Sequence, residues 1–318
     1  MNENIPIALQ KLYGCVSKGL GIAVIPKDVR DILGRQVAQI EMFNDKKGII
    51  NEISDLSYNE QLSVTETQEL YERTCSRLLH QEMKKQENIE NIISSAKDIL
   101  EKEREDLIST KDVNEDWLMR FFNSVQDISD EKMQLLWGKI LAGEIKQPNS
   151  FSLRSLDAMT KMSKDEAQLF EKLSSYVINF RGTYAILNDD NLNERYSIPY
   201  GQILALDECG IIDSSAMMSL ALGIDSKTTL EVSYDSQLLI ATAKDERKIR
   251  IQIFKLTRIG MEIFKIVGCH YNNEYFGEVA KILAKENKEI SFSIHKILNK
   301  LEDGRVEYIA QGTEVIPD

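Results

Sequence analysis

Cysteine and histidine are scarce in this chain of 318 residues, which contains four cysteines and three histidines. Cys15, Cys75, Cys209 and Cys269 lie far apart and show no paired spacing, so the sequence predicts no disulfide framework. No histidine has a second ligand at metal spacing, and the adjacent side chains of Cys269 and His270 point in different directions. We therefore expect no bound metal and a reducing, cytoplasmic environment.

Motifs that bind phosphate or carry catalysis are also absent. The sequence has no Gly-rich phosphate loop, no HExxH, no GxSxG and no deaminase pattern. Gly19-Leu-Gly21 has neither the preceding strand nor the later glycine of a dinucleotide site. We expect a protein without a cofactor that is not an enzyme. An enzyme with an unrecognised site would need a solvent-open pocket that combines Glu144 with another titratable residue.

Positive charge and long apolar runs are in short supply as well. The chain has 39 basic and 51 acidic residues, and its net charge of −12 repels nucleic acid and anionic membranes at long range. No apolar run is long enough to span a bilayer, and the N-terminus carries Glu3 instead of a basic segment, so we expect neither a secretion signal nor stable membrane insertion. Residues 5–26 are mostly apolar and glycine-containing. They are interpreted as a closely packed helix or, alternatively, as a membrane-facing segment.

Helical periodicity is the strongest positive signal, and it is clearest from Trp117 to Leu173. Apolar residues spaced three to five apart predict successive helices there, with Asn114 as an N-cap, Ser129 before a second start and Pro148 as a stop. Ser163 and Glu166 form a capping box for a further helix. We predict that Trp117 and Trp137 lie in the core.

The same stretch resembles a known family. The resemblance rests on the runs Trp117-Leu-Met-Arg-Phe-Phe122, Ser129-Asp-Glu131, Leu136-Trp-Gly-Lys-Ile-Leu-Ala-Gly-Glu144 and Phe151-Ser-Leu-Arg-Ser-Leu156, and on Gln86-Glu-Asn-Ile-Glu90 upstream. These runs are similar to the core of an uncharacterised bacterial domain family that has no assigned activity. More remotely, such proteins resemble the abortive-infection alpha group of phage-defence proteins, and a defence role is implied by that analogy alone.

A long helical tract begins at Ser63, which forms a second capping box with Glu66. Within the tract, the candidate assembly seam consists of Ile89, Ile92, Ala96 and Ile99, which follow one another in steps of three and four. Such a line of apolar residues indicates either an intramolecular helical hairpin against the Trp117 core or a surface for self-association.

Glu144 follows the apolar stripe of its helix, and a buried carboxylate without a partner would be costly. Arg120 and Arg154 are candidates for the countercharge, because a guanidinium can bind a carboxylate through two N–H groups. We therefore predict a structural ion pair. A catalytic acid or base and an exposed side chain are the alternatives.

Beyond Pro199 the order of helix, glycine, two strands and Leu256-Thr-Arg-Ile-Gly260 resembles a winged-helix module. Its strands are rich in basic residues, and the candidate nucleic-acid-binding residues are Lys244, Arg247, Lys248, Arg250 and Arg258. Alternatively, these side chains keep the outer face of a half-buried hairpin soluble and protect its edge.

These observations predict a mainly α fold, in which an N-terminal and central helical bundle with a long helical hairpin precedes a smaller α/β winged-helix-like C-terminal module. The expected divisions are an N-terminal helical segment (1–60), a helical core (61–187), the winged-helix-like module (188–268) and a small α/β appendage (269–318). The expected function is that of a bacterial, cytosolic interaction protein that assembles with itself or with a protein partner. The alternative is a DNA-binding regulator that uses the basic hairpin.

Overall fold

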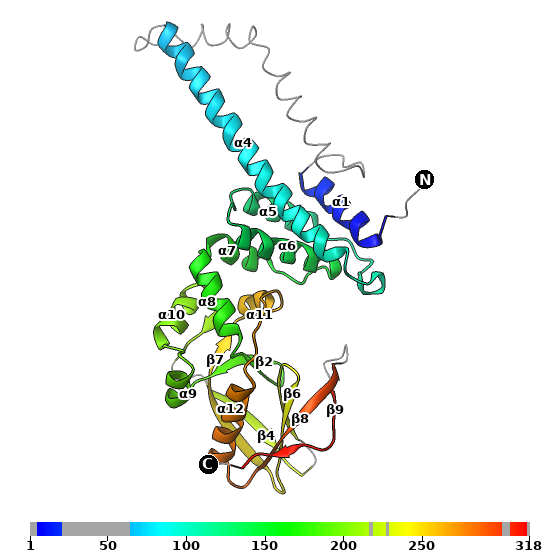
Figure 1. Ribbon diagram of the computed structural model, residues 1–318, viewed down its shortest axis with the longest axis vertical. Coiled ribbons are helices and arrows are strands. Elements are labelled where there is room, and N and C mark those ends of the chain that lie inside the picture. Colours follow the sequence, from blue (N-terminus) through cyan, green and yellow to red (C-terminus); the bar gives the residue numbers. More distant parts are fainter. Residues whose placement is uncertain (1–4, 21–63, 216–218, 227–228, 301–305, 317–318) are drawn as a thin grey trace. The chain divides into compact units, whose positions relative to one another are not determined.

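The computed structural model describes residues 5–20, 64–215, 219–226, 229–300 and 306–316 (Figure 1). The chain divides into two compact units, residues 1–160 and 161–318. The division into four segments made from the sequence stays a prediction.

The described part of the first unit is helical. Its helices are α1 (Ile7–Leu20), α4 (Val64–Leu100), α5 (Glu115–Val125), α6 (Glu131–Lys146) and most of α7 (Leu153–Lys161), with a short 3-10 turn at Glu105–Leu107. No proline or glycine occurs between residues 64 and 100, so nothing interrupts α4. Its C-terminal half packs on α6, and α1 packs on α5 (Figure 1).

The core of this unit is built around its two tryptophans, as the sequence predicts. Trp117 is 5% exposed and Trp137 is fully buried, and the Phe121 ring lies 5.2 Å from the first and 5.6 Å from the second between ring centroids. Gly138 allows the close approach of α4 and α6, because a Cβ there would lie 2.6 Å from Cβ of Ser95. The apolar periodicity around Trp117 therefore does produce a packed core.

Most of the predicted helix ends are confirmed. Asn114 accepts a hydrogen bond from the N–H of Trp117, and Ser163 with Glu166 completes the capping box of α8 (Lys164–Ser174). The second helix starts one residue later than predicted, because the carboxylate of Asp130 takes the capping role expected of Ser129. The other predicted capping box begins at Ser63, which lies outside the described residues.

The second unit contains a ten-stranded antiparallel sheet. Its strands are β1 (Ile178–Phe180), β2 (Thr183–Leu187), β3 (Ile212–Asp213), β4 (Ser219–Ile224), β5 (Leu230–Tyr234), β6 (Gln237–Thr242), β7 (Arg247–Leu256), β8 (Ser291–Lys300), β9 (Val306–Tyr308) and β10 (Thr313–Glu314). The main path runs β10-β8-β6-β5-β1-β2-β7-β3, with β4 paired to β7 and β9 paired to β8.

This sheet overturns the predicted fold class. A mainly α chain with a small winged-helix-like module is wrong, because strands from residue 178 to residue 314 join one large sheet. Strand β7, which was expected to form part of a two-stranded wing, pairs with β2, β3 and β4. The physical reason is that β1 and β2 are only three and five residues long and β2 ends in three buried side chains, so neither shows a clear alternation or a helical period. The alternation of β7 identifies a strand, but it does not reveal that β2, β3 and β4 are its partners.

Helices accompany the sheet in the second unit. They are α8, α9 (Asp190–Arg195), α10 (Tyr200–Glu208), α11 (Arg258–Phe264) and α12 (Asn273–Glu286). Helix α12 contributes Tyr275 and Phe276, which are fully buried, and the Phe276 ring stacks on Tyr234 of β5 with ring centroids 5.1 Å apart. Thr257 caps α11 by accepting from the N–H of Gly260. These contacts place the core of this unit between the sheet and its helices.

Candidate functional site

The N-terminal half of α4 extends beyond the helices that pack on its C-terminal half (Figure 1). It carries exposed large apolar side chains, which we call the projecting row: Leu70, Leu78, Leu79 and Met83. Leu78 is 47% and Met83 is 52% exposed, although leucine and methionine are commonly buried. Leu79 and Met83 are four residues apart and share one face of the helix, whereas Leu70 lies on the opposite side from Leu79. Exposed apolar groups that share a face are typical of interaction surfaces.

The projecting row lies on an electrically balanced part of an acidic protein. Residues 69–87 contain four acidic and four basic side chains, whereas the whole chain has a net charge of −12. Several of these charges pair along the helix, including Arg73 with Glu69 at 3.5 Å and Lys85 with Glu82 at 2.8 Å. Two copies of the chain can therefore approach each other here with less like-charge repulsion than the net charge would impose.

The candidate assembly seam lies in the other half of α4. Ile89, Ile92 and Ala96 are buried and Ile99 is half-buried, on the part of α4 that packs on α6 of the same chain. This packing leaves little of these side chains for a second copy. Their role in self-association stays a prediction. Among the described residues of α4, the exposed large apolar side chains are those of the projecting row.

Glu144 is buried in α6, with 2% of its surface exposed. Its carboxylate accepts hydrogen bonds from the main-chain N–H groups of Asn149, at 2.6 Å, and Phe151, at 3.0 Å. Arg120 and Arg154 are both exposed. These main-chain donors make charge-assisted hydrogen bonds that stabilise a buried carboxylate. The predicted ion pair with Arg120 or Arg154 stays a prediction.

The five candidate nucleic-acid-binding residues have different surroundings. Arg247 lies 2.8 Å from the carboxylate of Glu289, and Arg258 lies 3.0 Å from that of Glu262. Lys244 is exposed in the turn before β7. Lys248 and Arg250 are exposed on β7, across from Gly223 and Ala221 of β4. Two of the five are therefore engaged by carboxylates, and nucleic-acid binding by this group stays a prediction.

Residues 7–20, within the segment interpreted as either packed or membrane-facing, form α1. This helix buries five side chains against the bundle, Ala8, Leu9, Leu12, Cys15 and Val16. A Cβ on Gly19 would collide with the Phe122 ring, so this glycine permits close packing. Residues 21–26 lie outside the described part of the chain. None of the helices that the structure describes is both long and apolar enough to cross a membrane.

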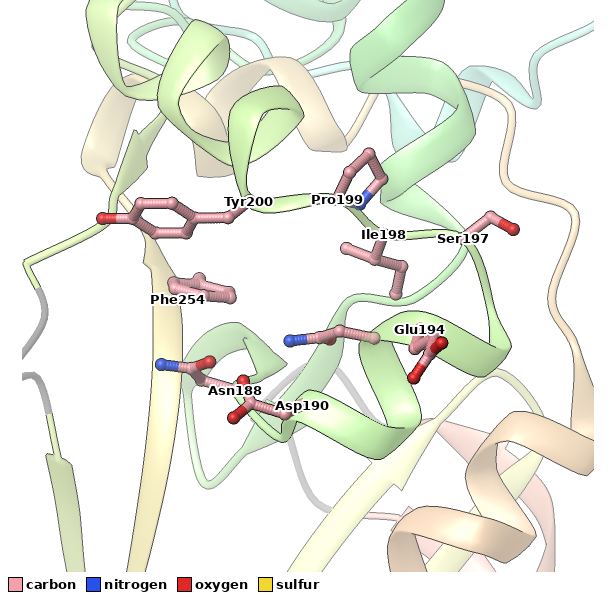
Figure 2. A pocket seen from close by; sticks show the side chains of 9 residues that line it. Asn188, Asp190, Glu194, Ser197, Ile198, Pro199, Tyr200 and Phe254 are labelled. Carbon is pink, nitrogen blue, oxygen red and sulfur yellow. The ribbon is translucent and has the colours of Figure 1, made fainter.

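The second unit contains a pocket of about 500 Å³ (Figure 2). Its lining comes from the end of β2, from α9, from the turn into α10 and from β7, and consists of Asn188, Asp190, Asn193, Glu194, Ser197, Ile198, Pro199, Tyr200 and Phe254. Tyr200 and Phe254 lie next to each other at one end, with ring centroids 6.0 Å apart, and Asn188 and Asp190 lie below them in Figure 2. We call this the α9–α10 pocket.

Helix α9 supplies the polar side of the α9–α10 pocket. Asp190, Asn193 and Glu194 are three and four residues apart, so they share one helical face. The helix is fixed by Asp189, whose carboxylate accepts from the N–H of Leu192 at 2.8 Å. The turn that follows places Ser197 at a φ of 53°, and the N–H of Ile198 donates to the main-chain oxygen of Asn193 at 2.8 Å. Rigid local structure therefore positions the polar groups.

The sequence interpretation missed this pocket. The division expected at residue 188 falls at the edge of the pocket, where a cluster of polar residues is also typical of a turn between domains. The one available signal was the spacing of Asp190, Asn193 and Glu194, but a short polar helix of that kind usually has only a solvated face. The aromatic partner, Phe254, comes from a strand more than 50 residues away, and pattern analysis cannot connect the two.

Among the described residues, no three histidine, cysteine, aspartate or glutamate side chains form a group that could hold a metal ion. A family model described as protein of unknown function (DUF2806) matches residues 72–280, from within α4 to within α12. Searches of curated proteins and of solved structures gave no match.

Proposed function

Because the chain belongs to the family described as protein of unknown function (DUF2806), a description that assigns no activity, we propose its function from geometry: it is an assembly protein in which the projecting row of α4 pairs with a second copy of the chain. The observation that carries this proposal is the exposure of Leu78, Leu79 and Met83 on a helix that is otherwise packed into a core.

The charge pattern supports a second copy as the occupant. A surface whose acidic and basic residues are equal in number can pair with an identical surface, whereas a uniformly acidic surface would repel one. The geometry is also suitable, since α4 has 37 residues and is roughly 55 Å long. Two such helices can form a two-helix contact without moving the bundle.

Light scattering coupled to size-exclusion chromatography tests the proposal on the full chain. We expect a mass twice that of the 36.3 kDa chain at micromolar concentration. The double variant Leu78→Glu/Leu79→Glu introduces two charges into the paired surface and should elute as a monomer with unchanged helix content. The matched control is Leu135→Glu, which charges an exposed leucine of α6 and should leave the assembly intact.

A wild-type chain that stays monomeric at about 100 µM, some hundredfold above a micromolar Kd, would refute this function. A monomer whose melting temperature falls on Leu78→Glu/Leu79→Glu would indicate that the row packs within its own chain and not against a second copy. A dimer that survives the double substitution would place the interface elsewhere.

We also propose that the assembly acts in the bacterial cytosol, in phage defence. The support is the remote analogy between proteins of this kind and the abortive-infection alpha group, together with four cysteines that are all free. Expression of the wild-type chain in a bacterial host should lower phage plaque counts at least tenfold, and the Leu78→Glu/Leu79→Glu variant should not. Equal plaque counts for the wild type, the variant and an empty vector would contradict the role in phage defence and leave the proposal of assembly unaffected.

A further inference from the structure

We propose that the α9–α10 pocket is a binding site for a guanidinium group, the planar cation carried by arginine. The proposal concerns the second unit and does not depend on assembly through α4. It rests on three features of the pocket, which are its charge, its aromatic wall and an asparagine side-chain oxygen that has no partner.

The charge of the pocket is negative. Asp190 and Glu194 contribute two carboxylates, and among the described lining residues none is basic. The nearby Arg195 is engaged elsewhere, since it lies 3.0 Å from the carboxylate of Glu278 and 5.8 Å from the centre of the Tyr196 ring. Lys172 donates to the main-chain oxygen of Ser197 at 3.3 Å. Both pocket carboxylates are exposed, so each can turn towards an incoming cation.

The aromatic wall suits a flat cation. Tyr200 is 51% exposed although it lies beside the buried Phe254, so much of its surface has no protein neighbour. A guanidinium stacks on an aromatic face through both its charge and its planar shape. An ammonium has the same charge but cannot stack as a plane, so the pocket should prefer arginine over lysine.

Asn193 supplies the third feature. Its side-chain oxygen is buried and has no hydrogen-bond partner in the structure. A buried acceptor of this kind is costly unless a donor reaches it, and an unpartnered one calls for an explanation. The oxygen is closed to solvent, so a ligand donor meets it only after the Asn193 amide turns towards the pocket. A guanidinium has five N–H donors in a fixed fork and no acceptor, so it could then satisfy this amide oxygen and a carboxylate together. A phosphate-bearing ligand is disfavoured, because its negative charge and its acceptor oxygens would face the carboxylates of Asp190 and Glu194.

The guanidinium could belong to a small molecule or to an arginine of a polypeptide, and titration calorimetry on the full chain separates the two. The probes are agmatine, N-acetyl-arginine amide and a heptapeptide with one central arginine. Similar affinity for all three indicates a small-molecule site, and at least tenfold tighter binding of the heptapeptide indicates a polypeptide. N-acetyl-lysine amide should bind several-fold more weakly than the arginine amide. The uncharged isostere N-acetyl-citrulline amide should not bind.

Variants then assign the binding to the pocket. Glu194→Gln keeps the shape of the side chain and should weaken arginine amide binding about fivefold, as expected for one exposed charge pair. Tyr200→Ala should weaken it to a similar or greater degree, whereas Tyr200→Phe keeps the ring and should bind as the wild type does. Glu231→Gln removes an exposed carboxylate from β5 and serves as the charge control.

Calorimetry that detects no saturable binding of any arginine probe at millimolar concentration would overturn the proposal. So would binding that falls equally in Glu194→Gln and Glu231→Gln, because that result would mean attraction to the acidic protein as a whole. Melting temperatures equal to that of the wild type would show that the variants remain folded.

Discussion

Trp117 donates a hydrogen bond from Nε1 to the main-chain oxygen of Phe151 over 2.8 Å. The main-chain N–H of the same phenylalanine donates to the carboxylate of Glu144. Two buried side chains from α5 and α6 therefore hold both polar groups of one residue in the turn that leads into α7. This arrangement satisfies backbone groups that would otherwise be costly in the core.

Replacing Glu144 with alanine should lower the free energy of unfolding by about 3 kcal/mol, because the N–H groups of Asn149 and Phe151 would lose a charged acceptor. Chemical denaturation followed by circular dichroism measures this change. Glu131→Ala removes an exposed carboxylate from the first turn of the same helix and should cost only about 0.5 kcal/mol. Equal decreases in the free energy of unfolding in the two variants would show that the buried hydrogen bonds of Glu144 contribute no more than an exposed carboxylate does.

Gly138→Ala should destabilise the protein by about 1–3 kcal/mol, since the added methyl group would collide with Ser95 and force α4 away from α6. Gly14→Ala is the control, because a Cβ at that position of α1 meets nothing within 4 Å. It should be neutral or stabilising by up to about 1 kcal/mol, through the lower entropy of the unfolded chain. Thermal melts should therefore show a lower melting temperature for Gly138→Ala and an equal or higher one for Gly14→Ala. Equal decreases in the two variants would contradict the close contact of α4 and α6 at Gly138.

Lys11 should contribute to holding α1 on the bundle. Its ammonium donates to the main-chain oxygens of Ser109, Lys111 and Ile145 at 2.7–3.0 Å, so all three of its donors are used. Lys11→Met keeps an apolar stem and removes these bonds, and we expect a loss of about 2 kcal/mol in denaturant titrations. Lys102→Met, at an exposed position, is the control. An unchanged unfolding midpoint for Lys11→Met would mean that α1 is held by its apolar face alone.

Tyr234 should make stability depend on alkaline pH. Burial raises the pKa of its hydroxyl to about 12, although the N–H of Asn272 acts in the opposite direction. An unfolded tyrosine titrates near pH 10, so the unfolded state releases its proton first and stability falls as the pH rises from about 10 to about 12. Below pH 10 this contribution is constant.

Tyr234→Phe should flatten the decline in stability over that alkaline range. At neutral pH it should cost about 1–3 kcal/mol, because the main-chain oxygen of Ser175 and the N–H of Asn272 each lose a partner. Denaturant titrations at several pH values measure both effects. Tyr308→Phe, at an exposed position, should change neither, and an identical alkaline slope in wild type and Tyr234→Phe would contradict the assigned pKa.

The helices from α5 to α8 were largely predictable from the sequence, and the sheet was not. Trp117, Trp137 and the caps at Asn114 and Ser163 act locally, so the spacing of nearby residues is enough to identify them. Strands β1 and β2, in contrast, are three and five residues long and are joined at Arg181 and Gly182, both with positive φ. Their partners β5 and β7 lie far along the chain. Such pairing follows from tertiary contacts that local periodicity does not encode.

The candidate sites show the same division. The spacing of Asp190, Asn193 and Glu194 is enough to predict the polar side of the α9–α10 pocket. The aromatic wall depends on the strand register that places Phe254 opposite Ile186. The exposed leucines of α4 were visible as apolar residues, yet the sequence alone could not tell which half of that helix the bundle would cover.

The unbroken course of α4 has a mechanical consequence. Leu78 and Ala96 are 18 residues apart on one helix, a distance of about 27 Å, with no proline or glycine between them to act as a joint. A partner that binds the N-terminal half of α4 can therefore rotate or tilt the C-terminal half of the same helix, where Ala96 contacts Gly138. Binding near Leu78 would then change the packing around Trp117 and Trp137.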